Sequence, residues 1–270
     1  MKTVLTIAGS DSIGGAGIQA DIKTIMAHGA YGMTAITAVT AQNTKGVESI
    51  EPISSIMLEQ QLKAVFEDIF PDAVKIGMIC SADQAKIIAE VLQKYTAKNV
   101  VVDPVMASTS GKTLAQDTAV KAMEKFLLPL ATVVTPNIPE ARKLWEGAVE
   151  TREDREKAAV DLAKKYGSYV LCKGGHEAGG ADDLLTDGSN VIWLPGKRIQ
   201  TTNSHGTGCT LSSAIAANLA KKMEVAVAVK EAKAYITGAL AAGLDIGKGN
   251  GPLHHGFALT GEFFRVDTVD

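Results

Sequence analysis

The chain alternates short apolar runs with amphipathic segments along most of its length. The apolar runs are rich in β-branched residues and predict strands, whereas the segments between them repeat apolar residues at helical spacing. We expect strands at Thr3–Ala8, Thr34–Ala38, Ala73–Ile76, Val100–Asp103, Thr132–Thr135 and Tyr169–Cys172. We expect helices at Ala16–His28, Ile56–Ile69, Ala82–Tyr95, Thr118–Leu130, Arg152–Tyr166, Thr207–Lys222 and Val225–Ala242.

Several predicted strands, such as Val100–Asp103, are apolar on both faces. Strands of this kind are typical of a mainly parallel sheet with helices on both sides. Two further strands, Asp183–Thr186 and Val191–Leu194, flank the polar turn Asp187–Asn190 and predict a hairpin. Because no linker or fixed-period repeat interrupts the pattern, we expect residues 1–270 to form one α/β domain.

Charge and cysteine content narrow the class of protein. The formal net charge of -3 gives no bias toward nucleic acid or an anionic membrane, so we expect neither as a partner. Cys80, Cys172 and Cys209 lie far apart, which indicates neither a disulfide framework nor a zinc site. No secretory cleavage pattern or apolar run of membrane-spanning length is present, so we expect a soluble cytoplasmic protein.

Polar and glycine-rich turns follow the predicted strands, which is where open α/β sheets bind ligands. The first strand leads into Gly9–Gly17, which contains four glycines. Equivalent turns after later strands are Thr40–Asn43, Gly77–Met78, Asp103–Val105, Thr135–Glu140 and Lys173–His176.

Residues Gly206 to Cys209 open a predicted helix with two glycines, a hydroxyl and a thiol. A helix N-terminus carries unpaired N–H groups and a partial positive charge, and glycine allows an anion to approach the backbone. We expect the same field to lower the pKa of Cys209, so that the thiol can accept a proton while the amides hold a phosphoryl group. On spacing alone, a small buried hydrophobe at Cys209 is equally compatible.

The common nucleotide and hydrolase motifs are absent. Gly9–Gly17 does not satisfy G-x-G-x-x-G, and Gly111-Lys112-Thr113 has Met106 where a Walker loop needs its first glycine. H-E-x-x-H and G-x-S-x-G are also missing. These absences leave open a phosphoryl-transfer enzyme whose nucleotide site is built differently from a Rossmann or Walker site.

Six ordered motifs match one known family. Through them the chain closely resembles the hydroxymethylpyrimidine and phosphomethylpyrimidine kinases of thiamin biosynthesis, in the ribokinase-like superfamily, over nearly its full length. The resemblance implies a three-layer α/β/α fold with a central mostly parallel sheet and a small lid element. It further implies a homodimer that uses ATP and Mg²⁺ to phosphorylate 4-amino-5-hydroxymethyl-2-methylpyrimidine and then its monophosphate. The matching motifs are Thr6–Asp11 with Gly14–Asp21, Thr37–Thr44, Val102–Met106, Val134–Asn137, Lys173–His176 and His205–Thr210.

The resemblance assigns roles at the phosphate end of the site. Gly206, Thr207 and Gly208 resemble the anion hole around the γ-phosphate, and Cys209 resembles the base toward the hydroxymethyl oxygen. The family implies that Lys173 contacts nucleotide phosphates, although a structural lysine with an exposed ammonium is an alternative.

Asn137 and Glu140 resemble the N-x-x-E motif, in which the glutamate organises Mg²⁺ through water. Asp103 is a plausible second carboxylate, because Mg²⁺ needs only one or two beside phosphate oxygens. The alternative for Glu140 is an acidic residue in a first helical turn after Pro139, stabilised by the helix dipole.

The resemblance also assigns the substrate pocket. Gln42 offers the donor and acceptor that an aminopyrimidine edge requires, although a glutamine facing solvent is the ordinary alternative. Ala16, Met78 and Val105 resemble pocket walls, and Asp21 is a weaker candidate for polar contact with substrate. His176 and His205 either contact phosphate or cap loops.

Two other functions compete with this assignment. Pyridoxal kinases share the architecture and the cysteine base, but Gln42-Asn43 argues against them. A ligand-binding protein without turnover would not need Cys209 together with Asn137, Glu140 and Lys173. Because few residues follow Phe264, we expect no fused thiamin-phosphate synthase domain.

Overall fold

The computed structural model describes residues 1–107, 116–175 and 180–261. Within these residues, nine strands form one sheet in the order β3-β2-β1-β4-β5-β6-β7-β8-β9. The six inner strands from β2 to β7 run parallel, and β3, β8 and β9 add antiparallel edges. The strands are β1 (Thr3–Asp11), β2 (Tyr31–Asn43), β3 (Gly46–Pro52), β4 (Ala73–Ile76), β5 (Val100–Val102), β6 (Val133–Val134), β7 (Tyr169–Cys172), β8 (Asp183–Thr186) and β9 (Val191–Leu194).

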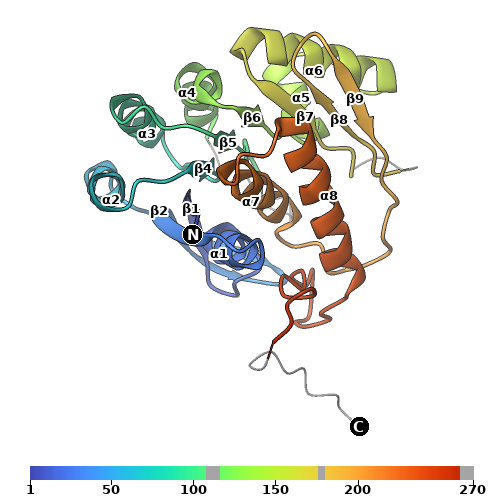
Figure 1. Ribbon diagram of the computed structural model, residues 1–270, viewed down its shortest axis with the longest axis horizontal. Coiled ribbons are helices and arrows are strands. Elements are labelled where there is room, and N and C mark those ends of the chain that lie inside the picture. Colours follow the sequence, from blue (N-terminus) through green and yellow to red (C-terminus); the bar gives the residue numbers. More distant parts are fainter. Residues whose placement is uncertain (108–115, 176–179, 262–270) are drawn as a thin grey trace.

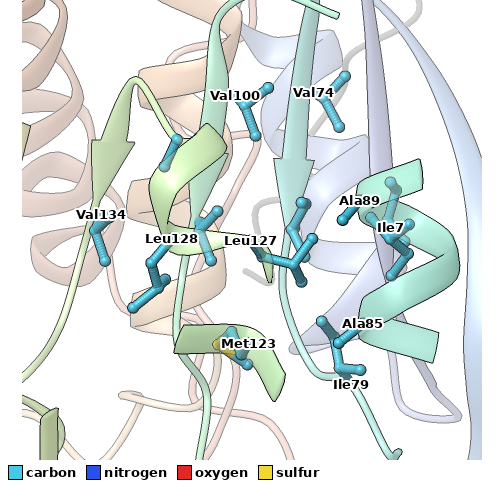
Figure 2. Close-up of a cluster of buried hydrophobic side chains, with 14 of the residues drawn as sticks. Ile7, Val74, Ile79, Ala85, Ala89, Val100, Met123, Leu127, Leu128 and Val134 are labelled. Atoms are coloured by element: carbon cyan, nitrogen blue, oxygen red, sulfur yellow. The ribbon is translucent and has the colours of Figure 1, made fainter. Parts of the chain in front are cut away.

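Alternating side chains of the sheet supply two separate cores. Leu5 and Ile7 of β1 pack with Val74 of β4 on one face, whereas Val4 packs on the other. Figure 2 shows part of the first core, where Ile7 lies beside the helical residue Ala89 and Val74 lies near Val100 of β5. Both faces must therefore be covered by helices, as the apolar strands predicted.

Helices cover both faces and confirm the three-layer architecture (Figure 1). The lid element expected from the resemblance had no residues assigned to it, and it stays a prediction. One face carries α2 (Ser55–Asp68), α3 (Ala82–Lys94), α4 (Asp117–Phe126), α5 (Ile138–Trp145) and α6 (Arg152–Tyr166). The other carries α1 (Gly17–Ala27), α7 (Thr207–Ala220) and α8 (Val225–Ala241).

Most predicted elements are confirmed, but one strand and one helix were missed and some predicted bounds differ. Edge strand β3 was missed because its outward positions are charged and exposed, so its hydrophobic period is weak. Helix α5 was missed because it has only 8 residues. The helix predicted over Thr118–Leu130 ends at Phe126, and Leu128–Leu130 forms a 3₁₀ turn around Pro129, which has no N–H to continue the helix.

Strand β2 is longer than predicted and reaches Asn43 instead of Ala38. This extension places Gln42 on a strand, where β3 pairs with it, instead of on a loop. In the part of the chain that the structure describes, no helix is both long and apolar enough to cross a membrane.

Candidate active site

A cavity of about 920 Å³ lies at the carboxyl ends of the parallel strands. The N-termini of α1 and α7 reach the same place, so two helix starts and several strand ends surround one space. Every predicted site residue except Asp21 lines this cavity, namely Ala16, Gln42, Met78, Asp103, Val105, Asn137, Glu140, Lys173, Gly206, Thr207, Gly208 and Cys209.

Two glycine-rich loops, the first at Gly9–Gly17 and the second at Gly206, meet at the start of α7. Gly206 adopts a left-handed conformation with φ of 87°, and a Cβ there would lie 1.8 Å from the carbonyl oxygen of Gly15. Only glycine permits this approach. The next residues form the first turn of α7, whose N–H groups have no intrahelical acceptor and can hold an anion.

Cys209 lies in that first turn with its side chain partly open to the cavity. The backbone N–H of Gly17 donates to the sulfur. Burial nevertheless raises the pKa of the thiol to about 11, with Lys75 opposing and Asp21 and Asp103 reinforcing the shift. The prediction of a lowered pKa is therefore wrong, because burial and two nearby carboxylates outweigh the helix terminus and the lysine.

Asp103, Glu140 and Lys173 form a charged cluster beside the first turn of α7. The Lys173 ammonium lies 2.7 Å from Asp103 Oδ1 and 3.9 Å from Glu140 Oε2. Burial alone would lower the pKa of Lys173, but Asp103 and Glu140 outweigh it and raise that pKa. Burial raises the pKa of Glu140 to about 7, against the opposing charge of Lys173. The cluster holds two carboxylates for one ammonium, so a bound cation would balance its charge.

Glu140 also caps the start of helix α5, as its position after Pro139 predicts. Its Oε2 accepts a hydrogen bond of 2.8 Å from the Asn137 N–H, and Asn137 Oδ1 accepts one of 2.8 Å from the Glu140 N–H. This reciprocal capping box starts α5. The alternative interpretation of Glu140, as a residue that stabilises a helix start, is therefore present in the structure whatever else Glu140 does.

The donor set fits Mg²⁺ held partly by phosphate. Asp103 Oδ1 accepts hydrogen bonds from Thr135 and Lys173, whereas Oδ2 faces Gly208, where a Cβ would lie 3.2 Å away. One carboxylate oxygen thus points at the anion-binding turn. Among the residues described, no three histidine, cysteine or acidic side chains gather as a metal cage. Mg²⁺ usually keeps several waters and uses one or two carboxylates plus phosphate oxygens, and Asp103 and Glu140 match that need.

Asp21 lies beneath the cavity instead of lining it. Its carboxylate is fully buried and accepts hydrogen bonds from Lys75, Thr6 and Ser213 at 2.6 to 3.0 Å. All of its neighbours come from the layer between the sheet and helices α1 and α7. The predicted contact between Asp21 and substrate is therefore wrong, and Lys75, which no motif singled out, is its partner.

The other end of the cavity holds Gln42 with Ala16, Met78 and Val105 around it. One terminal atom of the Gln42 amide lies 3.1 Å from His205 Nε2, which in turn lies 2.9 Å from Asp11 Oδ2. His205 thus contacts the predicted ring-binding side chain. The sequence predicted that His205 either contacts phosphate or caps a loop, and it did not predict the contact with Gln42, although His205 belongs to the motif His205–Thr210. His176, considered with it, lies outside the described residues.

Sequence reasoning also missed the wall opposite Gln42. Residues 196–201 of the connection between β9 and α7, together with Ile236 and Leu240 of α8, line this part of the cavity. The spacing of four between Ile236 and Leu240 was the available signal, since it puts both on one helix face.

The mostly parallel sheet, its two helical layers and the cavity at the strand ends define the ribokinase-like fold class, which the similar solved kinase structures share. The family model described as phosphomethylpyrimidine kinase matches residues 11–254. The chain belongs to the phosphomethylpyrimidine kinase family.

Individual relatives agree with that assignment. A hydroxymethylpyrimidine/phosphomethylpyrimidine kinase of Streptomyces coelicolor is 47% identical over 256 residues, 95% of each chain. The crystal structure of a phosphomethylpyrimidine kinase from Clostridium difficile is 45% identical with a TM-score of 0.79, and it covers 88% of this chain and 98% of that one. An ADP complex of Bacillus subtilis pyridoxal kinase is 38% identical with a TM-score of 0.88, covering 95% and 98%.

Proposed function

We propose that this protein transfers the γ-phosphoryl group of ATP to 4-amino-5-hydroxymethyl-2-methylpyrimidine and then to the resulting monophosphate. One observation carries the proposal: a single cavity is lined by Gln42 at the end of β2 and by residues 196–201 after β9, and the first turn of α7, with Cys209, lines it too. Helix α7 packs on β1, β4 and β5, which lie between β2 and β9 in the sheet. A pyrimidine beside Gln42 and a nucleotide beside residues 196–201 would meet at that turn. The kinases and the ADP-bound relative found by comparison support ATP as the donor.

The reaction assigns a separate task to each part of the site. The hydroxymethyl oxygen attacks the γ-phosphorus, the bond to the ADP oxygen breaks, and the hydroxyl proton passes to the sulfur of Cys209. Lys173 and the first-turn amides of α7 stabilise the charge on the transferring phosphoryl oxygens. Asp103 and Glu140 would hold Mg²⁺, which supplies further neutralisation of the phosphate oxygens when bound.

Only the thiolate form of Cys209 can accept the proton. Because the pKa of this thiol is raised to about 11, the thiolate is a minor species at neutral pH and its fraction increases with pH. We therefore expect turnover to rise with pH above neutrality when Cys209 acts as the base.

Pyridoxal phosphorylation is the competing function, since a pyridoxal kinase is among the similar structures. Parallel assays of ADP formation with hydroxymethylpyrimidine, its monophosphate and pyridoxal separate the two. We expect turnover with both pyrimidines. Robust turnover of pyridoxal, with none of either pyrimidine, would contradict the proposal.

Substitution of Gln42 tests the ring assignment. In Gln42→Leu the bulk is kept but the donor and acceptor are lost, and an unpaired neutral partner costs about 1–3 kcal/mol. The KM for the pyrimidine should rise about 5- to 150-fold, while the KM for ATP changes little. Steady-state titration of both substrates measures this, and an unchanged pyrimidine KM would place Gln42 outside the pocket.

We further infer a homodimer that works in the cytoplasm, on the strength of the family resemblance. Light scattering should give a mass about twice the 28.2 kDa of the chain. A mass of one chain at working concentration would contradict the dimer.

A further inference from the structure

Gln42 is held at both its backbone and its side chain. Its backbone N–H donates to Ser12 Oγ at 2.9 Å, and its carbonyl accepts from the same hydroxyl at 2.7 Å. At the side chain, one amide atom lies 3.1 Å from His205 Nε2 and the other 3.3 Å from Thr40 Oγ1. The amide is therefore fixed in place, and the remaining question is which of its two ends carries the oxygen.

Asp11 decides the protonation of the facing imidazole nitrogen. Its carboxylate accepts hydrogen bonds from the backbone N–H groups of Ile13, Gly15 and Ala16 as well as facing His205. Burial alone would raise the pKa of Asp11, but these donors outweigh it and lower that pKa. An ionised carboxylate only accepts hydrogen bonds. Because Asp11 Oδ2 lies 2.9 Å from His205 Nε2, this nitrogen must carry the proton.

A protonated Nε2 cannot face an amide NH₂ group without two donors meeting. The Gln42 oxygen must therefore be the atom next to His205, and its NH₂ group must lie next to Thr40. Thr40 agrees with this orientation. Its single hydroxyl hydrogen goes to the Ser10 carbonyl at 2.9 Å, which leaves the Thr40 oxygen free to accept from the Gln42 amide.

We propose that His205, held by Asp11, is a positioning residue that determines substrate specificity by fixing the order of donor and acceptor on the Gln42 amide. The single Nε2–H of the imidazole is shared between Asp11 Oδ2 and the amide oxygen, and Thr40 Oγ1 anchors the amide nitrogen. The inference rests on the proposed function, since it concerns how Gln42 receives the pyrimidine ring.

The fixed order has a chemical consequence. A 4-aminopyrimidine edge presents an amino donor beside a ring-nitrogen acceptor, whereas the corresponding 4-oxo compound presents a carbonyl acceptor beside an N–H donor. An amide that cannot rotate by half a turn fits only one of these patterns in a given ring position. A freely rotating amide fits both. His205 therefore excludes the 4-oxo analogue by preventing rotation of the amide.

The test compares kcat/KM for the 4-amino and 4-oxo hydroxymethylpyrimidines in wild type, His205→Leu and His205→Gln. In His205→Leu we expect the amino-to-oxo ratio to fall about 5- to 50-fold, with the KM for the pyrimidine changing more than kcat. A glutamine can donate to both Asp11 and Gln42, so His205→Gln should keep the ratio within about threefold of wild type. A merely structural role for His205 would change both substrates alike.

Thr40→Val provides an independent variant of nearly the same shape, and it releases the other end of the amide. The ratio of kcat/KM for the 4-amino over the 4-oxo substrate should also fall in Thr40→Val. Unchanged ratios in the folded variants would overturn the inference while leaving the proposed function intact. Absence of ADP formation by the wild-type protein with hydroxymethylpyrimidine would instead overturn the proposed function, and the inference with it.

Discussion

Two lysine–carboxylate clusters lie within electrostatic reach of Cys209, and they differ in whether they are closed to the cavity. Lys75 and Asp21 are sealed, with both side chains 0% exposed. Lys173 and Asp103 face the cavity, and the lysine retains 15% of its side-chain exposure. Charge on Cys209 affects the pKa of both lysines, so both clusters act on the same thiol.

In the sealed cluster, the hydrogen-bond partners of the Asp21 carboxylate are all protein groups. Thr6 and Ser213 donate to the Asp21 carboxylate, and Lys75 contacts both of its oxygens. The open cluster has two carboxylates for one lysine and an anion-binding turn beside it. The difference teaches that a buried ion pair alone does not mark a reaction site. Access from the cavity to a polar atom distinguishes the open cluster, for which we propose a catalytic role, from the sealed one.

The thiol near both clusters should give the largest effect. Cys209→Ala removes the proton acceptor, and we expect turnover to fall by about 10²- to 10⁴-fold, the usual range for losing a general base. Folding and ATP binding should be preserved, as checked by circular dichroism and nucleotide titration. Turnover near the wild-type value in the folded variant would make Cys209 a packing residue.

Lys173→Met disables the open cluster. Loss of one donor to the phosphoryl oxygens should lower kcat by about 10²- to 10³-fold. Lys143 is the matched control, because it also lines the cavity but pairs with the exposed Asp117 at 2.6 Å. Steady-state kinetics should find Lys143→Met within about threefold of wild type. Equal losses in the two variants would remove the special role of the open cluster.

Lys75→Met disables the sealed cluster, and here the free energy of unfolding should suffer most. Removing one partner of a buried pair costs about 3–5 kcal/mol, because Asp21 is left buried without its counter-charge. Urea denaturation measures the loss. The control Lys63→Met breaks an exposed pair with Glu59 and should change the free energy by less than about 1 kcal/mol.

A double variant sharpens the third test. Lys75→Met combined with Asp21→Asn removes both charges, so it should recover part of the lost free energy of unfolding. If the double variant is less stable than Lys75→Met alone, the ion pair is not the source of the effect.

The last test concerns the pKa of the Cys209 thiol itself. With its pKa raised to about 11, Cys209 should react slowly with iodoacetamide at neutral pH. Its rate should increase by about tenfold for each pH unit between 7 and 10, because the thiolate is the nucleophile. Peptide mass spectrometry distinguishes Cys209 from Cys80 and Cys172. If the rate instead levels off below pH 9, the pKa of Cys209 is lowered, as the position of Cys209 at the helix N-terminus predicted.

Most of the fold was predictable because long elements repeat their hydrophobic pattern. Arg152–Tyr166 and Tyr169–Cys172 have the predicted bounds. The edge strand Gly46–Pro52 was not predictable in the same way, because its order depends on pairing with β2 and not on its own apolar content.

The site was predictable where motifs carry the chemistry and unpredictable where packing decides. The residues at strand ends meet because parallel strands end at one edge. The position of Asp21 depends on Lys75, which comes from a strand 54 residues away and has no motif of its own. The pKa of Cys209 depends on how much protein surrounds the thiol, and local sequence does not contain that quantity.

The contact between Asp11 and His205 closes a loop of 194 residues. Loops of this length form late, because the chain must order its intervening strands before the two ends remain together. During synthesis, the first glycine loop leaves the ribosome long before the second exists. On the proposed function, we expect an amino-terminal fragment that stops before α7 not to bind phosphate at this site, because it lacks the first-turn N–H groups of α7. Recovery of activity during refolding should therefore report the last long-range step of folding, after the secondary structure has formed.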